Sequence, residues 1–188
     1  MKKLLGFSIF LVFVLIASLT AEAKVTLPAI FSDNMVLQQN TQVNVWGKAA
    51  PGEKVTVKAS WLDKAVTAKA AANGKWTVKL KTPKAITNQS VTVSGENEIT
   101  INNVLIGEVW LCTGQSNMEF PVSRHPDVKW NTGMLNEAEE LKDADYPEIR
   151  LFHVKHQLAH EGELDDCEGE WLVCLSLIHI SEPTRRRG

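Results

Sequence analysis

The sequence predicts an α+β protein built in two successive parts, an antiparallel β-sandwich followed by the beginning of an α/β domain. Two patterns support this prediction. Short runs of alternating apolar and polar residues fill positions 25–101, and a longer apolar run at positions 104–112 precedes a helix-forming stretch. Alternation with period two is typical of half-buried strands, whereas a continuous apolar run is typical of a strand that is covered on both faces.

Residues 1–23 are predicted to be a secretory signal peptide. Lys2 and Lys3 precede an apolar run at positions 4–19, and Ala21-Glu22-Ala23 follows with the small residues that a signal peptidase accepts. The mature chain would begin at Lys24 and be secreted or periplasmic, without further membrane contact. The alternative is an uncleaved membrane anchor, for which the apolar run is short.

The predicted sandwich domain covers residues 24–103. Its strands are indicated by apolar residues at alternate positions: Val43-x-Val45, Val55-x-Val57, Trp76-x-Val78-x-Leu80, Val91-x-Val93 and Ile99-x-Ile101. Its turns are indicated by dipeptides that supply a fixed or positive φ: Pro51-Gly52, Asn73-Gly74 and Ser94-Gly95. This close spacing of strands and turns favours antiparallel pairing.

The second predicted domain covers residues 104–174. Its first strand would run through positions 104–112, with helices on both faces. A stretch rich in Glu, Leu and Ala at positions 130–142 predicts a helix, which Tyr146-Pro147-Glu148 would end. Positions 149–154 then predict a second strand, so the chain would have entered an α/β domain.

Residues 175–188 do not continue this pattern. Positions 175–185 resemble the conceptual translation of a transposon-type sequencing adapter, which predicts that the segment is a non-native tail. The alternative is a genuine C-terminal strand with an arginine-rich end.

Composition limits the partners that the protein could have. The formal net charge is −2 and the basic residues are scattered, so the chain lacks the field that would concentrate nucleic acid. Cys167 and Cys174 could pair in an exported protein, which would leave Cys112 as a small buried strand residue. The spacing of the cysteines is not that of a metal site, and neither a metal nor a cofactor is expected.

Ser116 is the candidate nucleophile. It follows Gly114-Gln115 at a predicted strand-to-helix junction, where a hydroxyl is raised above the sheet edge and backbone N–H groups can face a developing oxyanion. A serine at such a junction can also be a simple helix N-cap. Gln115 and Asn117 could bind a sugar hydroxyl or the acyl oxygen, or could secure the turn.

Several ordered segments resemble a known family. Gly114-Gln115-Ser116-Asn117-Met118, with the Glu119-Phe120-Pro121-Val122 that follows, is similar to the nucleophile block of the sialate O-acetylesterase family, a branch of the SGNH (GDSL-like) hydrolases. Four other blocks are similar to that family and occur in its order: positions 27–38, 45–52, 74–76 and 169–174. The resemblance therefore covers most of positions 25–174 and implies that residues 104–174 begin an SGNH-like esterase domain.

The resemblance implies a chemistry for one residue in particular. Ser116 matches the family's nucleophile, and its own N–H would form one arm of the oxyanion hole. The family's Asp and His, and its other oxyanion donors, have no matching positions here. Because a serine hydroxyl needs a base to accept its proton, the chain alone is expected to be inactive or nearly so.

Other polar and aromatic residues have weaker functional interpretations. We interpret the histidines as surface or loop residues and not as a base or a metal cluster; they are His125, His153, His156 and His160. Glu161 and Asp165 are interpreted as solvated carboxylates. Glu119 and Asp127 favour interactions with a helix dipole. Trp46, Trp61 and Trp76 could form a platform for sugar stacking, although alternate strand positions more often point into a core.

The resulting hypothesis is a serine-dependent carbohydrate O-acetylesterase that removes acetyl groups from sialic acid or another acetylated sugar. Its partner would be an O-acetylated carbohydrate. The alternative is a non-catalytic carbohydrate-binding β-sandwich protein, in which the Ser116 loop is only a cap. In that case substitution of the tryptophans would abolish glycan binding and Ser116→Ala would change nothing.

Overall fold

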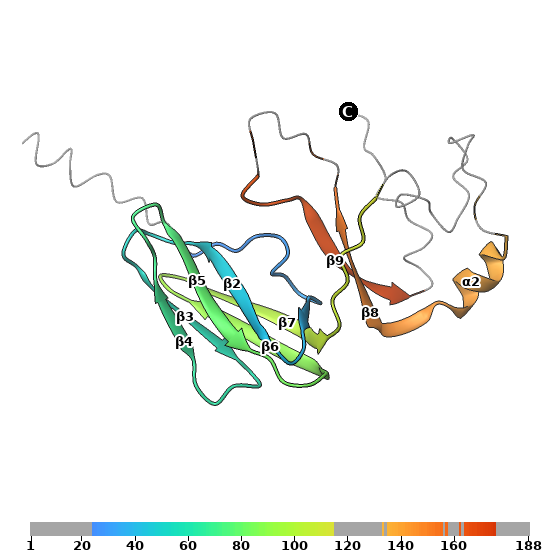
Figure 1. The fold of residues 1–188 in the computed structure, drawn as a ribbon, viewed down its shortest axis with the longest axis horizontal. Helices are drawn as coiled ribbons and strands as arrows, with labels where there is room; N and C mark the ends of the chain where they lie inside the picture. The colour runs from blue at the N-terminus through green and yellow to red at the C-terminus, as the bar shows by residue number, and fades with distance from the viewer. Residues whose placement is uncertain are drawn as a thin grey trace, which may run out of the picture.

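The computed structural model describes residues 24–114, 133, 135–155, 157, 162 and 164–175. This part of the chain is mostly strand, with one helix (Figure 1). The elements in chain order are β1 (Val36–Gln38), β2 (Gln42–Lys48), β3 (Lys54–Ala59), β4 (Val66–Lys69), β5 (Lys75–Lys81), β6 (Ile86–Ser94), β7 (Glu98–Gly107), α2 (Glu137–Asp143), β8 (Asp145–Val154) and β9 (Gly169–Leu175).

Two sheets make up the N-terminal part. One has five strands in the order β1-β7-β6-β3-β4, and the other is the antiparallel pair β2-β5. Gly52 and Gly74 both adopt positive φ, as the predicted turns require. The prediction of purely antiparallel pairing is wrong at β1, which runs parallel to the end of β7. These two strands are far apart in the sequence, and a long connection permits a parallel pair.

The core lies where alternating apolar side chains of the two sheets meet. On β5 the burial alternates strictly, with Trp76, Val78 and Leu80 buried and Thr77 and Lys79 between them exposed. Val57 and Val93 of the five-stranded sheet belong to the same buried cluster. Complete burial of one such aliphatic side chain contributes about 1.5–3 kcal/mol, so this period-two pattern specifies which face of each strand turns inward.

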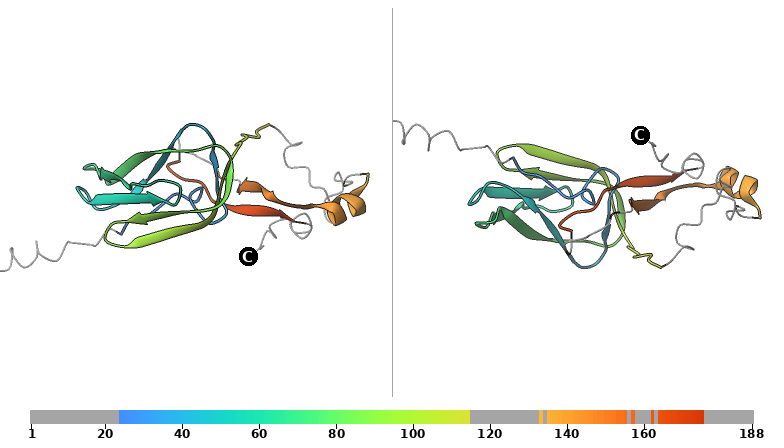
Figure 2. Two further views of the ribbon diagram at one scale, coloured as in Figure 1. Left: turned by 90° about the horizontal axis from the view of Figure 1, so that it is seen from below. Right: turned by 90° about the horizontal axis from the view of Figure 1, so that it is seen from above.

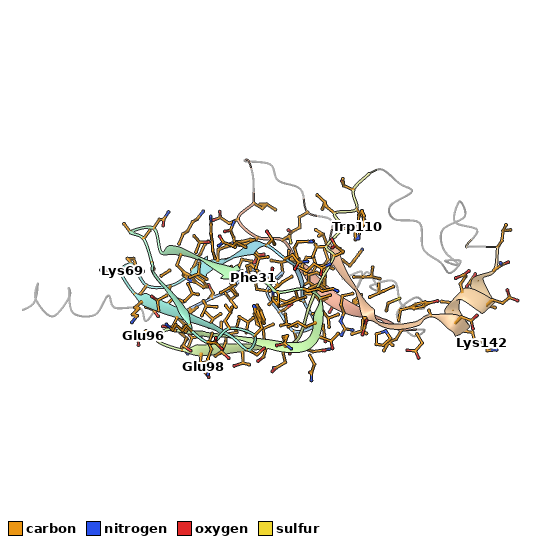
Figure 3. All side chains as sticks on the ribbon, turned by 60° about the horizontal axis from the view of Figure 1, so that its bottom comes forward. Phe31, Lys69, Glu96, Glu98, Trp110 and Lys142 are labelled. Atoms are coloured by element: carbon orange, nitrogen blue, oxygen red, sulfur yellow. The ribbon has the colours of Figure 1, made fainter. Side chains whose placement is uncertain are left out.

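The segment before β1 also packs into this core. Val25, Phe31 and Met35 are buried there, although they lie outside regular strands. Figure 3 labels Phe31 among the side chains of this part. The side chain of Asn97 bonds both backbone groups of Val25, at 2.6 Å from its N and 3.2 Å from its O. The N-terminal segment is therefore attached to the sheets by apolar packing and by hydrogen bonds.

The apolar run after position 103 differs from its prediction. Val104, Leu105 and Ile106 are buried, but they complete β7 within the five-stranded sheet and do not begin a separate strand. Pairing with β1 stops at Gly107, and Trp110 and Leu111 beyond it are 83% and 91% exposed. The expected strand over 104–112 with helices on both faces is therefore wrong, because its pairing partners end at Gly107. The predicted domain division at 103/104 falls inside β7 and stays a prediction.

Strands β8 and β9 form an antiparallel pair of their own. The strand expected at 149–154 is confirmed, and it begins earlier, at Asp145. The helix expected at 130–142 is present as α2 over Glu137–Asp143. Figures 1 and 2 show β8, β9 and α2 extending away from the N-terminal strands.

The predicted signal peptide and the predicted adapter tail lie outside the described residues, apart from Leu175 at the end of β9. Within the part that is described, no helix is long and apolar enough to span a bilayer.

Candidate functional site

Ser116, Gln115 and Asn117 lie outside the described residues, so their assignment as nucleophile and possible substrate ligands stays a prediction. The structure does describe the segment that leads to them. Residues 108–114 leave the end of β7 without forming a strand. The predicted junction placed the end of a strand at Cys112. This part of the prediction is wrong, because the strand ends at Gly107.

Two glutamines at the end of β1 hold the beginning of the segment 108–114. Gln38 Nε2 and Gln39 Nε2 donate to the two carboxylate oxygens of Glu108 at 3.0 and 2.7 Å. The backbone N–H of Val109 donates to Gln38 Oε1 at 2.9 Å. The side-chain hydrogen bonds from Gln38 and Gln39 lower the pKa of Glu108. The carboxylate form is therefore favoured, and the direction in which the chain leaves β7 is specified by side chains.

A pocket with a volume of about 670 Å³ lies elsewhere, on the outer face of the β2-β5 sheet. Residues from β2, β5, the N-terminal segment and the connection between β8 and β9 line it; those used below are Thr26, Trp46, Lys48, Lys75, Trp76, Thr77, Asp165 and Asp166. We call it the Trp46 pocket. The side chains of Trp46, Lys48, Lys75 and Thr77 point outward, because alternate residues of a strand face opposite sides of the sheet and Trp76 faces the core.

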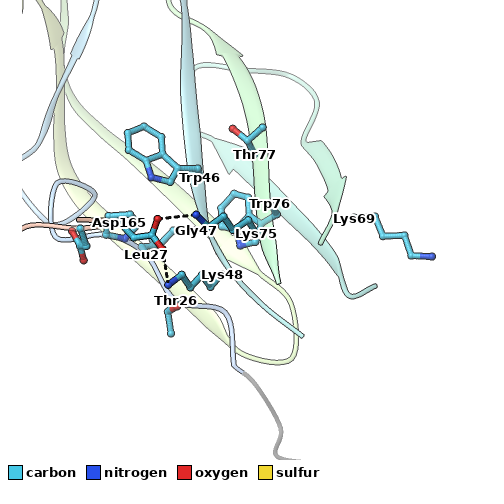
Figure 4. A pocket seen from close by; sticks show the side chains of 12 residues that line it. Thr26, Leu27, Trp46, Gly47, Lys48, Lys69, Lys75, Trp76, Thr77 and Asp165 are labelled. Atoms are coloured by element: carbon cyan, nitrogen blue, oxygen red, sulfur yellow. Dashed lines mark hydrogen bonds and ion pairs between the residues drawn. The ribbon is translucent and has the colours of Figure 1, made fainter. Parts of the chain in front are cut away.

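Asp165 bridges two lysines at the wall of the Trp46 pocket (Figure 4). Its carboxylate oxygens lie 2.7 Å from Lys75 Nζ and 3.3 Å from Lys48 Nζ. Lys48 and Lys75 are direct cross-strand partners, and like charges in such a pair repel. Hydrogen bonds and charge interactions from Lys75 and then Lys48 lower the pKa of Asp165. The carboxylate therefore compensates a repulsion that the strand register creates.

Two further bonds, one from the connection between β8 and β9 and one from β9, reach the segment before β1. Asp166 Oδ1 accepts from the backbone N–H of Ala29 at 3.1 Å, and Trp171 Nε1 donates to the carbonyl oxygen of Ile30 at 2.8 Å. The wall of the pocket is thus built from segments that are far apart in sequence. Sequence reasoning interpreted Asp165 as a solvated carboxylate and missed its lysine partners, because that contact depends on tertiary packing.

The three tryptophans considered as a sugar platform are not equivalent. Trp76 is only 3% exposed and belongs to the core. Trp61 is half-buried and bonds the carbonyl oxygen of Lys81, at the other end of β5 from Lys75. Trp46 is 41% exposed and meets Phe31 edge to face, with ring centroids 4.6 Å apart. Trp46 is therefore the one of the three that can offer a ring to a ligand in this pocket.

The other candidate residues provide little chemistry within the described part. His153 is exposed on β8, and the described residues contain no group of three His, Cys, Asp or Glu that could hold a metal ion. His125, His156, His160, Glu119, Asp127 and Glu161 lie outside that part.

The cysteines also differ from their prediction. Cys112 is exposed instead of buried, because the strand expected there is absent. Cys167 carries a free thiol, so the pairing with Cys174 is not formed between these two described residues.

Comparison with known proteins identifies the relatives of this chain. No family model matches it. The sialate O-acetylesterase of Mus musculus is 31% identical over 150 residues, which are 73% of this chain and 26% of that protein. The Homo sapiens sialate O-acetylesterase is 28% identical over 81% of this chain and 28% of its own length. The chain is homologous to the sialate O-acetylesterases.

A solved structure agrees with this relationship. XAC1771, described as a novel carbohydrate acetylesterase from Xanthomonas citri, superimposes with a TM-score of 0.70 at 29% sequence identity. The match covers 82% of this chain and 33% of that structure. The resemblance to sialate O-acetylesterases that the motifs predicted is confirmed. The chain spans about a quarter of the length of the curated sialate O-acetylesterases that it matches.

Proposed function

We propose that the protein is a carbohydrate O-acetylesterase with Ser116 as its nucleophile. The observation that carries this proposal is the agreement of two independent similarities over most of the chain, one in sequence to sialate O-acetylesterases and one in structure to a carbohydrate acetylesterase. The Gln38–Glu108 contact supports it, since it holds the segment that leads to Ser116. The proposed arrangement is a β-sandwich domain followed by the beginning of an SGNH-like domain.

The proposed reaction is acyl transfer in two steps. Ser116 Oγ loses its proton to a base and forms a bond to the acetyl carbonyl carbon. The ester bond between that carbon and the sugar oxygen then breaks, and the sugar oxygen takes up the proton and leaves as a hydroxyl. Water then attacks the acetyl-serine, which releases acetate and restores the hydroxyl. Gln115 and Asn117 are placed beside the nucleophile by sequence and would bind the substrate or the acyl oxygen. The names of the relatives support the substrate class, which is O-acetylated sialic acid or another acetylated sugar.

The resemblance assigns no base to Ser116 within this chain. None of its residues matches the Asp and His of the family, so we expect the 188-residue chain alone to hydrolyse esters only at a residual rate. An independent genomic read beyond position 174 tests this expectation. An Asp-x-x-His element in the same frame supports the esterase, whereas a stop codon there favours the non-catalytic carbohydrate-binding alternative.

The nucleophile is tested on the longest product of that frame with p-nitrophenyl acetate. Ser116→Ala should reduce turnover by at least about a thousandfold, because no other group can form the acetyl-enzyme. Ser123→Ala is the matched control, since it removes a hydroxyl from the same stretch of sequence and should leave turnover unchanged. Labelling with a fluorophosphonate should modify Ser116, and an adduct on a different residue would overturn the assignment.

We also propose that the protein is exported, to the periplasm or the exterior, after cleavage between Ala23 and Lys24. The basic start, the apolar run and the small residues before Lys24 support this proposal.

A further inference from the structure

The outer face of the β2-β5 sheet presents an aromatic ring where a strand normally presents polar residues. Its other outward positions carry polar or charged side chains, among them Asn44, Lys48 and Thr77. Trp46 stands directly across from Thr77 in the register and leaves 41% of its surface exposed. Because Trp46 lines a pocket, the exposed part of its indole is available to a ligand there.

The Trp46 ring is held in place before any ligand arrives. Phe31, which is buried in the core, packs against it edge to face, with the ring centroids 4.6 Å apart and the ring planes at 81°. Such an edge-to-face pair keeps the indole in one orientation. A ligand that binds it therefore does not have to restrict its conformational entropy further. The pocket therefore contains a pre-oriented apolar surface beside polar groups.

The polar groups of the pocket are nearly balanced in charge. Lys48 and Lys75 share the carboxylate of Asp165, and Asp166 adds a second negative charge nearby. The amino group of Lys69, another lining residue, points away from this cluster (Figure 4). A phosphate or another strong anion would meet two carboxylates here. A ligand with many hydroxyl groups would instead find ammonium donors and carboxylate acceptors together.

We propose that the Trp46 pocket is a second, non-catalytic site that binds a pyranose unit of a glycan. The C–H face of a pyranose ring is apolar and would stack on Trp46, while its hydroxyls would bond Lys48, Lys75 and the Asp165–Asp166 wall. A pocket of about 670 Å³ is within the range of small-molecule sites. The choice of a carbohydrate rests on the proposed function, whereas the position of the site rests on the pocket geometry alone.

Such a site would hold the chain of sugars and not the ester. Asp165 and Asp166 lie in the connection between β8 and β9, whereas Trp46 and Lys75 belong to the N-terminal sheet. A bound pyranose would therefore contact both parts and stabilise their association. Binding in this pocket requires no acetyl group, which separates it from the proposed hydrolysis.

The test measures binding of unacetylated oligosaccharides to the 188-residue chain by isothermal titration calorimetry. Xylohexaose represents a neutral plant polysaccharide, and sialyllactose represents a sialylated glycan. Trp46→Ala should weaken whichever of the two binds by about tenfold or more, because the stacking surface is removed. Trp61→Ala is the matched control, since Trp61 is another partly exposed indole, in the turn between β3 and β4, and does not line the pocket. This variant should bind as the parent chain does.

A second variant guards against a folding defect. Trp46→Phe keeps an aromatic ring and should retain more affinity than Trp46→Ala, and circular dichroism shows whether each variant is folded. Binding by neither oligosaccharide, or equal binding by the parent and Trp46→Ala, would overturn the site. Turnover of p-nitrophenyl acetate by the longer product needs no glycan, so activity without glycan binding rejects only this site. Glycan binding with no effect of Ser116→Ala on turnover rejects only the esterase.

Discussion

At the scale of single residues, Asp165 shows how a charge acquires a role from its surroundings. It is an exposed side chain on an irregular connection, yet two lysines from neighbouring strands converge on it. Exposed ion pairs contribute little to the stability of a protein. Their effect here is on protonation and on geometry, since both oxygens of Asp165 are oriented at the wall of the pocket.

The lowered pKa of Asp165 makes a testable prediction. Because the folded carboxyl has a lower pKa than the unfolded one, the stabilisation is fully present above the unfolded value and is lost as the pH falls through the folded value. Carbon-detected NMR of the side-chain carboxyl should show Asp165 titrating below the usual range of aspartate. Replacing Lys75 with Ala should raise this pKa more than replacing Lys48, because Lys75 makes the larger contribution. An unchanged titration in both variants would contradict the ion pairs.

At the scale of elements, β7 connects the two predicted parts of the chain. Its first half carries the alternating residues Ile99 and Ile101, and its second half carries the continuous run Val104–Leu105–Ile106. Val104, Leu105 and Ile106 are all buried, so both faces of β7 are covered there, and its edges pair with β6 and with the parallel strand β1. The burial of this run was predicted correctly. The run completes β7 of the five-stranded sheet, however, and does not begin a separate strand.

The contact between Gln38 and the end of β7 should control the segment that follows. Gln38→Ala removes the acceptor of the Val109 N–H and one donor to Glu108, so hydrogen exchange at Val109 should become faster. Gln42→Ala, at the exposed start of β2, is the control and should leave that amide unchanged. Acidification through the lowered pKa of Glu108 should lower the protection of Val109 relative to its intrinsic exchange rate at each pH, because a protonated carboxyl accepts weaker hydrogen bonds from Gln38 and Gln39. If neither Gln38→Ala nor acidification alters the protection of the Val109 amide, the contact is refuted.

At the scale of the whole molecule, the described chain consists of the two N-terminal sheets and a two-stranded extension attached to them. Polar contacts between them include Trp171 on Ile30, Asp166 on Ala29 and Asp165 on two lysines. Trp171 of β9 also packs against the apolar core of the N-terminal sheets. The β8 strand leaves Ile149, Leu151 and Val154 exposed. The extension is therefore joined by both polar and apolar contacts.

Export is a property of the whole chain and is tested by the mature N-terminus. Expression of the gene in a bacterial host with fractionation should place the protein outside the cytoplasm, and N-terminal sequencing should begin at Lys24. Replacing Ala21 and Ala23 by leucine should prevent processing, because the peptidase pocket requires small residues. Recovery of the parent protein with Met1 intact in the cytoplasm would exclude the signal peptide.

The sequence by itself determined the local structure and the family. Period-two alternation specified β2, β3, β5 and β6, because burial of one strand face is a local choice between two sides. Ordered motifs identified the sialate O-acetylesterase relationship that the comparisons confirmed. Tertiary structure alone decided the parallel partner of β7, the exposure of Cys112 and the contacts of Asp165 with two lysines. These depend on segments far apart in the chain, whose encounter is decided by the packing of the whole core and not by any local pattern.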